Sequence, residues 1–436
     1  MDPLTAGLIA CGGVIVLTLL GVRIAFAAGV TGVVGLIATR GWGPGTGMAG
    51  LLAYQEATHY TLSVLPMFIL IGYLAFHAGL TQGAFHAARC WFGRLPGGLA
   101  VATVFAAAGF GAVSGASTAS AAVFSRVAIP EMLRYGYDKR LAAATVAAGG
   151  TLAALIPPSA ILVIYGIIVE QSVGALLLAG FIPGAISAVN YAVIIMVWCK
   201  INPKLAAPMP KVSWSEKVRS LGQTWGILAV IGITLGGLYT GWMTPTEVGG
   251  AGAFIMFCLA LAHRTKWSTI WEAIRETSKL SVMIFTIIWS ILILVRFLGF
   301  TGVPATISEW IGGMQVPRLA ILLMILGLYL VLGMFLDGIG MLLLTLPVVY
   351  PIILKLGYDP IWFGIIIVKM VEIGLVTPPV GLNCFVVNGV RPDIPLSTVF
   401  AGIWPFVVAD CLTIALLIAF PDIVTYLPTT MGNGGG

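Results

Sequence analysis

Charged residues are scarce in this chain of 436 residues, at 9% of the total, whereas soluble globular proteins carry about 25%. Several long stretches contain no Asp, Glu, Lys or Arg at all: 3–22, 57–88, 141–169, 171–199 and 220–246. A membrane-spanning helix needs about 20 such residues. Together with a mean hydropathy of +1.05, this scarcity excludes a soluble protein and predicts a polytopic membrane protein.

The apolar runs also lack the two-residue alternation of a membrane β-barrel. Backbone polar groups in lipid must be paired within the protein, so only helices and closed barrels span a bilayer. We therefore expect an all-α fold. The first run follows Met1-Asp2 without a basic region, which favours a retained span over a cleaved signal peptide.

Cysteine and histidine are sparse as well, and neither indicates a site. The six cysteines, Cys11, Cys90, Cys199, Cys258, Cys384 and Cys411, show no close pairing, so no disulfide or metal framework is expected. The four histidines, His59, His77, His86 and His263, are isolated and are interpreted as packing or interfacial residues. The sequence shows no cluster typical of an enzyme, and we expect no prosthetic group.

The net charge of +6 does not indicate a nucleic-acid partner. Its cations lie in connecting loops, which is the positive-inside bias of membrane proteins. Residues 200–219 hold five cations against the single acid Glu216 and form the longest polar connection, so we place them in the cytoplasm. This linker separates a first repeat, 1–199, from a second repeat, 220–422, which a tail, 423–436, follows.

Glycine and proline, by contrast, are abundant and recur at a fixed offset. Gly136-Tyr137-Asp138 returns 221 positions later as Gly357-Tyr358-Asp359, and Pro157-Pro158 returns as Pro378-Pro379. Doubled glycine- and proline-broken segments in the two halves of a membrane protein are typical of transporters, whose binding sites they mark. The repeat predicts that this chain moves a solute.

Each half is expected to contain five spans. In the first half they lie at about 4–22, 24–39, 61–80, 139–170 and 173–199, and in the second at about 221–240, 243–262, 280–300, 360–390 and 396–420. An odd number of spans inverts the second half, so both termini are predicted to face outward. Residues 265–279 are expected to form an interfacial amphipathic helix, with 48–60 as a weaker counterpart.

Each half also contains a segment too long for one span and too short for two, at 97–129 and at 319–349. Two half-helices of about 14 residues reach roughly 20 Å, short of the ~30 Å hydrocarbon core. We therefore expect a re-entrant hairpin in each half, with one long tilted helix as the alternative for 97–129. Non-helical backbone at that depth must be buried in protein or line a cavity.

The candidate sites lie at four places: the two hairpin tips and the two interruptions, which are the Pro-Pro pairs inside 139–170 and 360–390. Proline interrupts a helix, which frees carbonyl oxygens for Na⁺ and begins a half-helix whose positive end suits a carboxylate. One cation site would use Ser114, Gly115, Ser117, Thr118, Thr151 and a carbonyl at Pro157, and the other Gly333, Asp337, Gly338, Thr377, a carbonyl at Pro378, and Asn383. The substrate would contact Ser117, Pro158, Ser159, Pro379, Gly381 and Asn383.

Structural alternatives stand beside several of these assignments. Asp337 is the only acid of its hairpin, and burying an acid is costly enough to indicate function, yet it can also be structurally paired. Glu372 has the same ambiguity, because it can pair with Lys369. The small residues 114–118 can equally serve tight helix packing. Residues 244–247, Thr-Pro-Thr-Glu, are predicted to begin a helix.

Several motifs together resemble a known family. They are Gly136-Tyr137-Asp138, Leu155-Ile156-Pro157-Pro158-Ser159 with Tyr165-Gly166, Ala179-Gly180-Phe181-Ile182-Pro183-Gly184 and Thr377-Pro378-Pro379-Val380-Gly381. They resemble the large membrane subunit of TRAP transporters, the tripartite ATP-independent periplasmic carriers of bacteria and archaea. The Ser-Gly-Ala-Ser-Thr tip departs from the family's commoner Ser-Gly-Ser form at Ala116.

This resemblance implies an elevator-type fold with a scaffold and a transport domain in the cytoplasmic (inner) membrane. It also implies Na⁺-driven import of a small carboxylate, with a soluble periplasmic binding protein as partner. A small four-helix membrane subunit is the second partner, and we expect it to be a separate chain because 436 residues leave no room for it. Membrane lipid surrounds such a protein.

A stand-alone ion-coupled organic-anion carrier with the same broken helices is the alternative function. A channel would need a continuous polar or charged ring, which these spans lack. The sequence does not name the cargo, because in this family a separate protein selects it.

Overall fold

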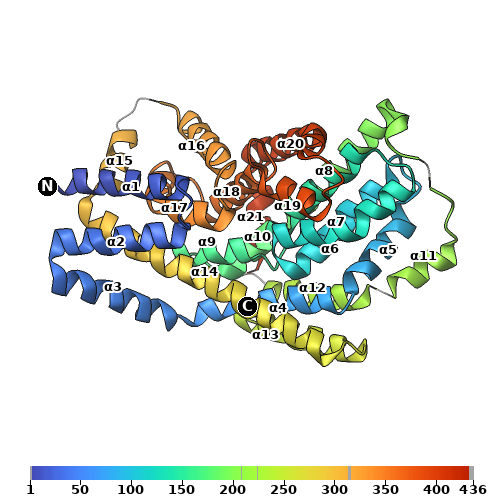
Figure 1. The fold of residues 1–436 in the computed structure, drawn as a ribbon, viewed down its shortest axis with the longest axis horizontal. Coiled ribbons are helices and arrows are strands. Elements are labelled where there is room, and N and C mark those ends of the chain that lie inside the picture. Colours follow the sequence, from blue (N-terminus) through green and yellow to red (C-terminus); the bar gives the residue numbers. More distant parts are fainter. Residues whose placement is uncertain (1, 208, 223, 313–315, 432–436) are drawn as a thin grey trace.

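The computed structural model describes residues 2–207, 209–222, 224–312 and 316–431, and within these ranges it contains helices and no strands (Figure 1). The first part of the chain forms α1 (Pro3–Leu19), α2 (Ile24–Arg40), α3 (Trp42–Ala57), the 3₁₀ turn η1 (Tyr60–Ser63), α4 (Val64–His77), α5 (Leu80–Phe92), α6 (Gly98–Ser114), α7 (Ser117–Arg134), α8 (Lys139–Thr151), η2 (Leu152–Ala154), α9 (Ala160–Ile168) and α10 (Val173–Ile201). The predicted all-α fold is confirmed.

The second part of the chain also consists of short and long helices. It forms η3 (Pro203–Leu205), α11 (Trp214–Leu221), α12 (Trp225–Tyr239), α13 (Pro245–Ala262), α14 (Trp267–Thr301), α15 (Val303–Gly312), α16 (Arg318–Gly333), α17 (Gly338–Lys355), α18 (Pro360–Gly374), α19 (Leu382–Val390), α20 (Leu396–Ala419) and α21 (Asp422–Thr430). Six helices among the described residues, counting η1 with α4, are long and apolar enough to span a membrane: 60–77, 173–201, 245–262, 267–301, 338–355 and 396–419.

One packing group is built around the long helix α14, and we call it the α14 group. It comprises α1–α4 with α12 and α13, and Figure 1 shows α14 (yellow) running along α2 towards α4. The backbones of α2 and α14 nearly touch, because a Cβ added to Gly32 would lie 2.7 Å from the backbone nitrogen of Leu294.

A second packing group surrounds α18, and we call it the α18 group. It contains α6–α10 with α16–α21, so both halves of the chain contribute to it. Helix α8 of the first half packs closely on α20 of the second, where a Cβ on Gly402 would lie 2.4 Å from the carbonyl oxygen of Arg140.

The repeated Gly-Tyr-Asp triplet has the same local structure in both halves. Gly136 and Gly357 adopt φ values of +76° and +72°, a left-handed conformation that ends α7 and α17 at little cost for glycine. Two residues later an aspartate caps the next helix: Asp138 accepts a 2.7 Å hydrogen bond from the N–H of Arg140, and Asp359 accepts one from Trp362. The triplet therefore repeats in local structure as well as in sequence.

The two hairpin segments differ from their predicted bounds. Their arms are 17 and 18 residues long in α6 and α7, and 16 and 18 in α16 and α17. The expectation of about 14 residues was wrong, since 18 residues rise about 27 Å, close to the ~30 Å core. Helix α7 also continues through Pro130 to Arg134, so the predicted end of the hairpin before Pro130 was wrong. An interior proline removes one backbone hydrogen bond and can bend a helix without ending it. The re-entrant path itself stays a prediction.

Other helix boundaries also differ from the predicted ones, because an amphipathic stretch and an apolar stretch form one continuous helix. The interfacial segment 265–279 and the span 280–300 form the single 35-residue helix α14. Helices α5 and α15 were not expected. Helix α11 begins in the predicted linker and ends two residues beyond it, and α21 begins one residue before the predicted tail, of which 432–436 are outside the described residues. The helix start at 244–247 is confirmed as a capping box between Thr244 and Glu247.

Replacing Gly32 by alanine should separate α2 from α14, because the new methyl group meets backbone atoms that cannot rotate away. We expect a loss of about 1–3 kcal/mol of stability, seen as a lower thermal unfolding midpoint of the purified protein in detergent. Gly12→Ala is the matched control, since a Cβ there meets nothing within 4 Å. Equal midpoints for the two variants would contradict this close packing.

Candidate functional site

The tip of the first hairpin meets the first Pro-Pro interruption. Helix α6 ends at Ser114, and Gly115 follows with φ +59°. A Cβ on Gly115 would lie 2.5 Å from the carbonyl oxygen of Pro158, so only glycine permits this approach. The interruption itself lies between η2 and α9, and Pro157 and Pro158 are both buried there.

Ser117, the first residue of α7, connects this tip to the second half of the chain. Its hydroxyl donates a 2.7 Å hydrogen bond to Oε2 of Glu372, which is buried in α18. On the other side, a Cβ on Gly150 of α8 would lie 2.9 Å from the Ser117 carbonyl oxygen. The tip is therefore held between one broken helix from each half.

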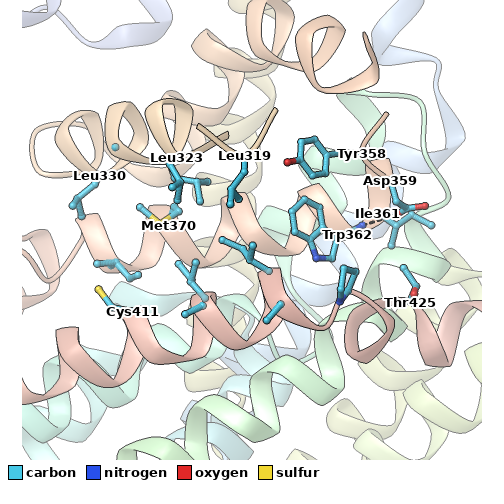
Figure 2. A pocket seen from close by; sticks show the side chains of 18 of the residues that line it. Leu319, Leu323, Leu330, Tyr358, Asp359, Ile361, Trp362, Met370, Cys411 and Thr425 are labelled. Carbon is cyan, nitrogen blue, oxygen red and sulfur yellow. Dashed lines mark hydrogen bonds between the residues drawn. The ribbon is translucent and has the colours of Figure 1, made fainter. Parts of the chain in front are cut away.

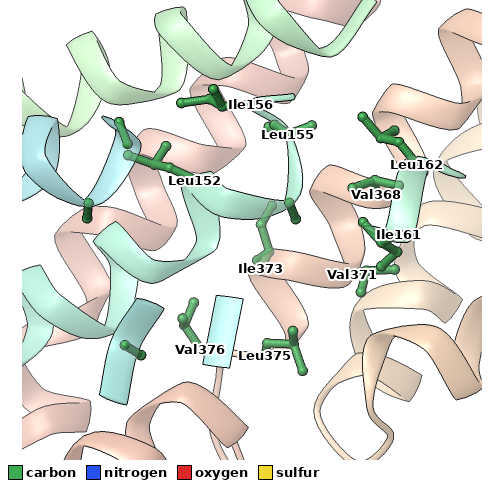
Figure 3. Packing of buried hydrophobic residues seen from close by; sticks show 14 of the residues in the cluster. Leu152, Leu155, Ile156, Ile161, Leu162, Val368, Val371, Ile373, Leu375 and Val376 are labelled. Carbon is green, nitrogen blue, oxygen red and sulfur yellow. The ribbon is translucent and has the colours of Figure 1, made fainter. Parts of the chain in front are cut away.

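The second interruption, 375–381, also reaches across to the first half. Asn383, at the start of α19, donates from Nδ2 to the Ala147 carbonyl oxygen of α8 at 3.3 Å. Its Oδ1 is buried and has no partner among the described residues. Figure 3 shows apolar residues of both interruptions packed together, including Leu152 and Ile156 from one and Leu375 and Val376 from the other.

The tip of the second hairpin packs on the same helices. A Cβ on Gly338 would lie 2.6 Å from Val371 of α18 and 3.2 Å from Ile161 of α9. Gly333 and Gly374 lie against each other, because a Cβ on Gly374 would be 2.6 Å from the Cα of Gly333. Both tips and both interruptions thus meet around α18.

Not all predicted site residues point into this region. Thr118 and Pro379 are exposed, unlike their buried neighbours Ser117 and Thr377. Asp337 is exposed too, and its Oδ1 accepts hydrogen bonds from the N–H groups of Ile339 at 3.1 Å and Gly340 at 3.0 Å. The structure therefore gives Asp337 a helix-capping role, which is the structural alternative.

Three predicted hydroxyl groups are engaged by the backbone of their own segment. Thr151 donates to the Ala148 carbonyl oxygen at 2.7 Å, and Thr377 donates to that of Ile373 at 2.6 Å. Ser159 caps α9 and donates to the carbonyl of Ala154. In contrast, the buried hydroxyl groups of Ser114, Ser120 and Thr145 have no partner among the described residues.

A buried ionic cluster lies next to this region and was missed by sequence reasoning. Lys369 of α18 forms a 2.5 Å ion pair with Asp410 of α20, and both side chains are at most 1% exposed. Tyr191 of α10 donates to Asp410 at 2.8 Å, and its hydroxyl lies 3.1 Å from that of Thr151. Lys369 does not form an ion pair with Glu372, which was the structural alternative for Glu372, because its nearer acid belongs to another helix. Asp410 was detectable as the only acid of the predicted span 396–420.

Two cavities lie beside the interrupted helices. The larger, about 1400 Å³, lies between α16, α18, α20 and α21. Figure 2 shows its apolar walls, with Leu319 and Leu323 facing Met370, and the stacked rings of Tyr358 and Trp362 at one end. Of the predicted site residues it reaches only Thr377.

The smaller cavity, about 270 Å³, lies between the first hairpin, α4 and α14. It contains Ser114 and is lined by Arg126 of α7, for which no ion pair exists among the described residues. Glu276 of α14 lines it too and is 3.0 Å from His77. The cavity thus combines apolar walls with one exposed arginine, one carboxylate and a hydroxyl group that has no partner among the described residues. Sequence reasoning missed Arg126, since it lies beyond the hairpin tip.

Outside the helices, Arg391 and Asp393 lie at the end of α19 and are joined by two 2.7 Å hydrogen bonds. The guanidinium group lowers the pKa of Asp393 to about 2. Lys139, at the start of α8, donates to the carbonyl oxygen of Asp393 at 3.4 Å. The loop after α19 therefore contacts the start of α8, and both of these helix ends lie away from the interruptions.

The comparison with protein families decides the assignment. A family model described as "Tripartite ATP-independent periplasmic transporter, DctM component" matches residues 11–423. The chain belongs to this family. It is therefore a TRAP transporter large permease, a multi-pass protein of a family of transporters and not of enzymes.

Individual relatives agree with this assignment. The C4-dicarboxylate TRAP transporter large permease DctM of Pseudomonas aeruginosa is 35% identical over 378 residues, 86% of each chain. The protein of the same name from Vibrio cholerae is 32% identical and 96% of each chain is covered. The isethionate TRAP permease DctMQ of Oleidesulfovibrio alaskensis is 32% identical over 86% of this chain and 58% of its own.

Solved structures share the fold at low sequence identity. The YdaH transporter of Alcanivorax borkumensis superposes with a TM-score of 0.56 at 13% identity, over 83% of this chain and 85% of its own. MtrF of Neisseria gonorrhoeae gives 0.50 at 13% identity, over 85% and 83%. The helical transporter architecture expected from the sequence is thereby confirmed.

Removing Asp410 alone should destabilise the TRAP permease strongly, because Lys369 would remain buried without a partner. We expect Asp410→Ala to cost about 3–5 kcal/mol, measured as loss of monodisperse protein after extraction. The double variant Lys369→Met with Asp410→Leu removes both charges and should recover most of the folded protein. If the double variant fares worse than the single one, the ion pair is not what makes Asp410→Ala harmful.

Proposed function

We propose that this TRAP permease imports a small organic acid together with Na⁺ by an elevator movement. The observation that carries the proposal is the meeting of both hairpin tips and both interruptions around α18. Interrupted helices at the centre of a repeat-built transporter supply ion ligands and anion-binding helix ends at one place.

The first Na⁺ site would lie between the tip of the first hairpin and the first interruption. Hard cations take oxygen ligands, and this region holds the unpartnered hydroxyl group of Ser114. The unpartnered Oδ1 of Asn383, assigned to the other site from the sequence, would contribute here instead, because Asn383 contacts Ala147 of α8. Carbonyl oxygens at Gly115 and Pro157 add to them. Ser117 would join by releasing its hydrogen bond to Glu372, which places a buried carboxyl group next to the ion.

The second Na⁺ site would use the corresponding place in the other half. Gly333 and Gly338 bring backbone carbonyl groups of the second tip against α18, and Thr377 and Pro378 supply oxygens from the interruption. Asp337 would contribute less to this site, and Thr118 less to the first site, since both side chains are exposed. No prosthetic group takes part in this mechanism.

The transported solute would be a small carboxylate. Helix α7 begins at the first tip, α9 and α19 begin at the interruptions, and the positive ends of all three favour an anion. Arg126 adds a full positive charge in the 270 Å³ cavity beside the first tip. Relatives are named for C4-dicarboxylates and sialic acid, which supports an organic acid as cargo.

The movement would carry the α18 group past the α14 group. The α18 group contains both interruptions and the α14 group contains neither, so the sites would move as one unit. Na⁺ bound at the tips would fix them against the interruptions before the group moves, which couples ion and solute.

Two partners would complete the transporter in the cytoplasmic membrane of a bacterium or archaeon. A separate small four-helix subunit would pair with this permease, and a periplasmic binding protein would deliver the solute. The longer relative DctMQ supports the small subunit as a partner. This chain matches only 58% of that relative, so the relative contains a further segment that this chain does not match.

Coupled uptake can be measured with the permease and its small subunit in proteoliposomes, with a C4-dicarboxylate such as succinate and related sugar acids as cargo. We expect accumulation only when an inward Na⁺ gradient and the cognate binding protein are both present, because the ion gradient supplies the free energy. Equal uptake without a gradient would contradict Na⁺ coupling, and equal uptake without the binding protein would contradict the tripartite assembly.

Ser117→Ala should weaken Na⁺ binding, because it removes a buried hydroxyl ligand at the first tip. A lost interaction of about 1.5–3 kcal/mol raises the Na⁺ concentration for half-maximal uptake roughly 10–150-fold. Thr118→Ala is the matched control, since the adjacent hydroxyl is exposed. The site would be misplaced if Thr118→Ala shifted the Na⁺ dependence as much as Ser117→Ala.

A further inference from the structure

A second cluster of ligating side chains lies far from the interruptions, where α5 and α11 pack side by side at the right of Figure 1. His86 and Cys90 are one helical turn apart on α5, and Glu216 lies in the first turn of α11. One ligand atom from each residue lies within 4.8 Å of the other two. The chain brings Glu216 there from the linker between the repeats.

The position of Glu216 is fixed by the way α11 docks on α5. Ser213 caps α11 by accepting a 3.2 Å hydrogen bond from the N–H of Glu216. The indole N–H of Trp91 donates to the Lys217 carbonyl oxygen at 3.2 Å, and the Trp91 and Trp214 rings pack edge to face at 5.7 Å. These contacts hold the first turn of α11 over the face of α5 that carries Cys90.

The ligand atoms are also free of other strong partners among the described residues. The buried Nδ1 of His86 has no hydrogen-bond partner, and its Nε2 has only a 4.0 Å contact with the sulfur of Cys90. Glu216 forms no ion pair with any described residue. Cys90 is a free thiol and is 2% exposed. An imidazole, a thiol and a carboxylate thus face one another with coordination capacity unused.

We propose that His86, Cys90 and Glu216 bind a divalent cation of the Zn²⁺ class. Sulfur, nitrogen and oxygen ligands suit this borderline-soft ion, whereas Mg²⁺ and Ca²⁺ prefer oxygen alone. Three protein ligands leave the fourth tetrahedral position to water. Bond lengths of about 2.0–2.3 Å bring the ligand atoms to about 3.3–3.6 Å from one another, so side-chain shifts of roughly 1 Å complete the site. As the metal–sulfur bond forms, the thiol proton is released to solvent.

Such a site would fasten the linker 200–219 to the first half of the chain. Helix α5 packs on α6, which is the first arm of the first hairpin. Through α5, the metal would therefore join the linker 200–219 to the hairpin arm α6. It would not contact the transported solute. This role is independent of Na⁺ coupling and of the cargo.

Co²⁺ is the probe, because a thiolate ligand gives it a charge-transfer absorption in the near ultraviolet. The full-length permease, purified without a polyhistidine tag, should bind one equivalent with this band, and Zn²⁺ should displace it. Cys90→Ser should abolish the band, whereas Cys258→Ser, which changes an exposed cysteine elsewhere, should leave it unchanged.

Glu216→Gln provides the second test, since Glu216 is exposed and its replacement leaves the packing of α5 intact. We expect it to weaken Co²⁺ binding at least about tenfold, with an unchanged elution profile in size-exclusion chromatography. No thiolate band in the wild-type protein, a band that survives Cys90→Ser, or unchanged affinity in Glu216→Gln would each overturn the proposal.

Discussion

The structure depends on the need to cover broken helices with protein. An interrupted helix at membrane depth exposes backbone N–H and C=O groups that lipid cannot pair. Here the hairpin tips provide that cover, and they can do so only because glycines stand at the contacts, Gly115 against Pro158 and Gly338 against Val371. In the proposed mechanism, the carbonyl groups that this packing shields from lipid would also be the ligands of a cation. Helix packing and ion binding would then compete for the same atoms.

The buried ionic cluster constrains this arrangement in a different way. Lys369, Asp410 and Tyr191 come from α18, α20 and α10, so these three helices must be in register for the ion pair and the tyrosine hydrogen bond to form together. A buried ion pair adds little net stability compared with apolar packing, but a single unpaired member is strongly unfavourable. The cluster thus selects one relative placement of the helices that carry the interruptions.

Much of the fold was predictable from local patterns, because charge-free runs and the doubled Gly-Tyr-Asp and Pro-Pro strings depend only on neighbouring residues. Helix ends were less predictable: Pro130 did not stop α7, and α14 absorbed an amphipathic segment. For the site, Ser117 and Asn383 could be chosen from the interruptions, but their partners Glu372 and Ala147 could not, since those contacts cross between the halves. The exposure of Thr118 depends on the rotation of α7, which its small residues leave open.

The hydrogen bond from Asn383 to Ala147 joins residues 236 positions apart in the chain. Synthesis at about 5–20 residues per second separates their appearance by roughly 10–50 s. During that interval the first half lies in the bilayer with its interruption still lacking α18 and α19. We therefore expect the membrane-insertion machinery, or a neighbouring protein, to cover this unfinished polar surface until the second half is inserted.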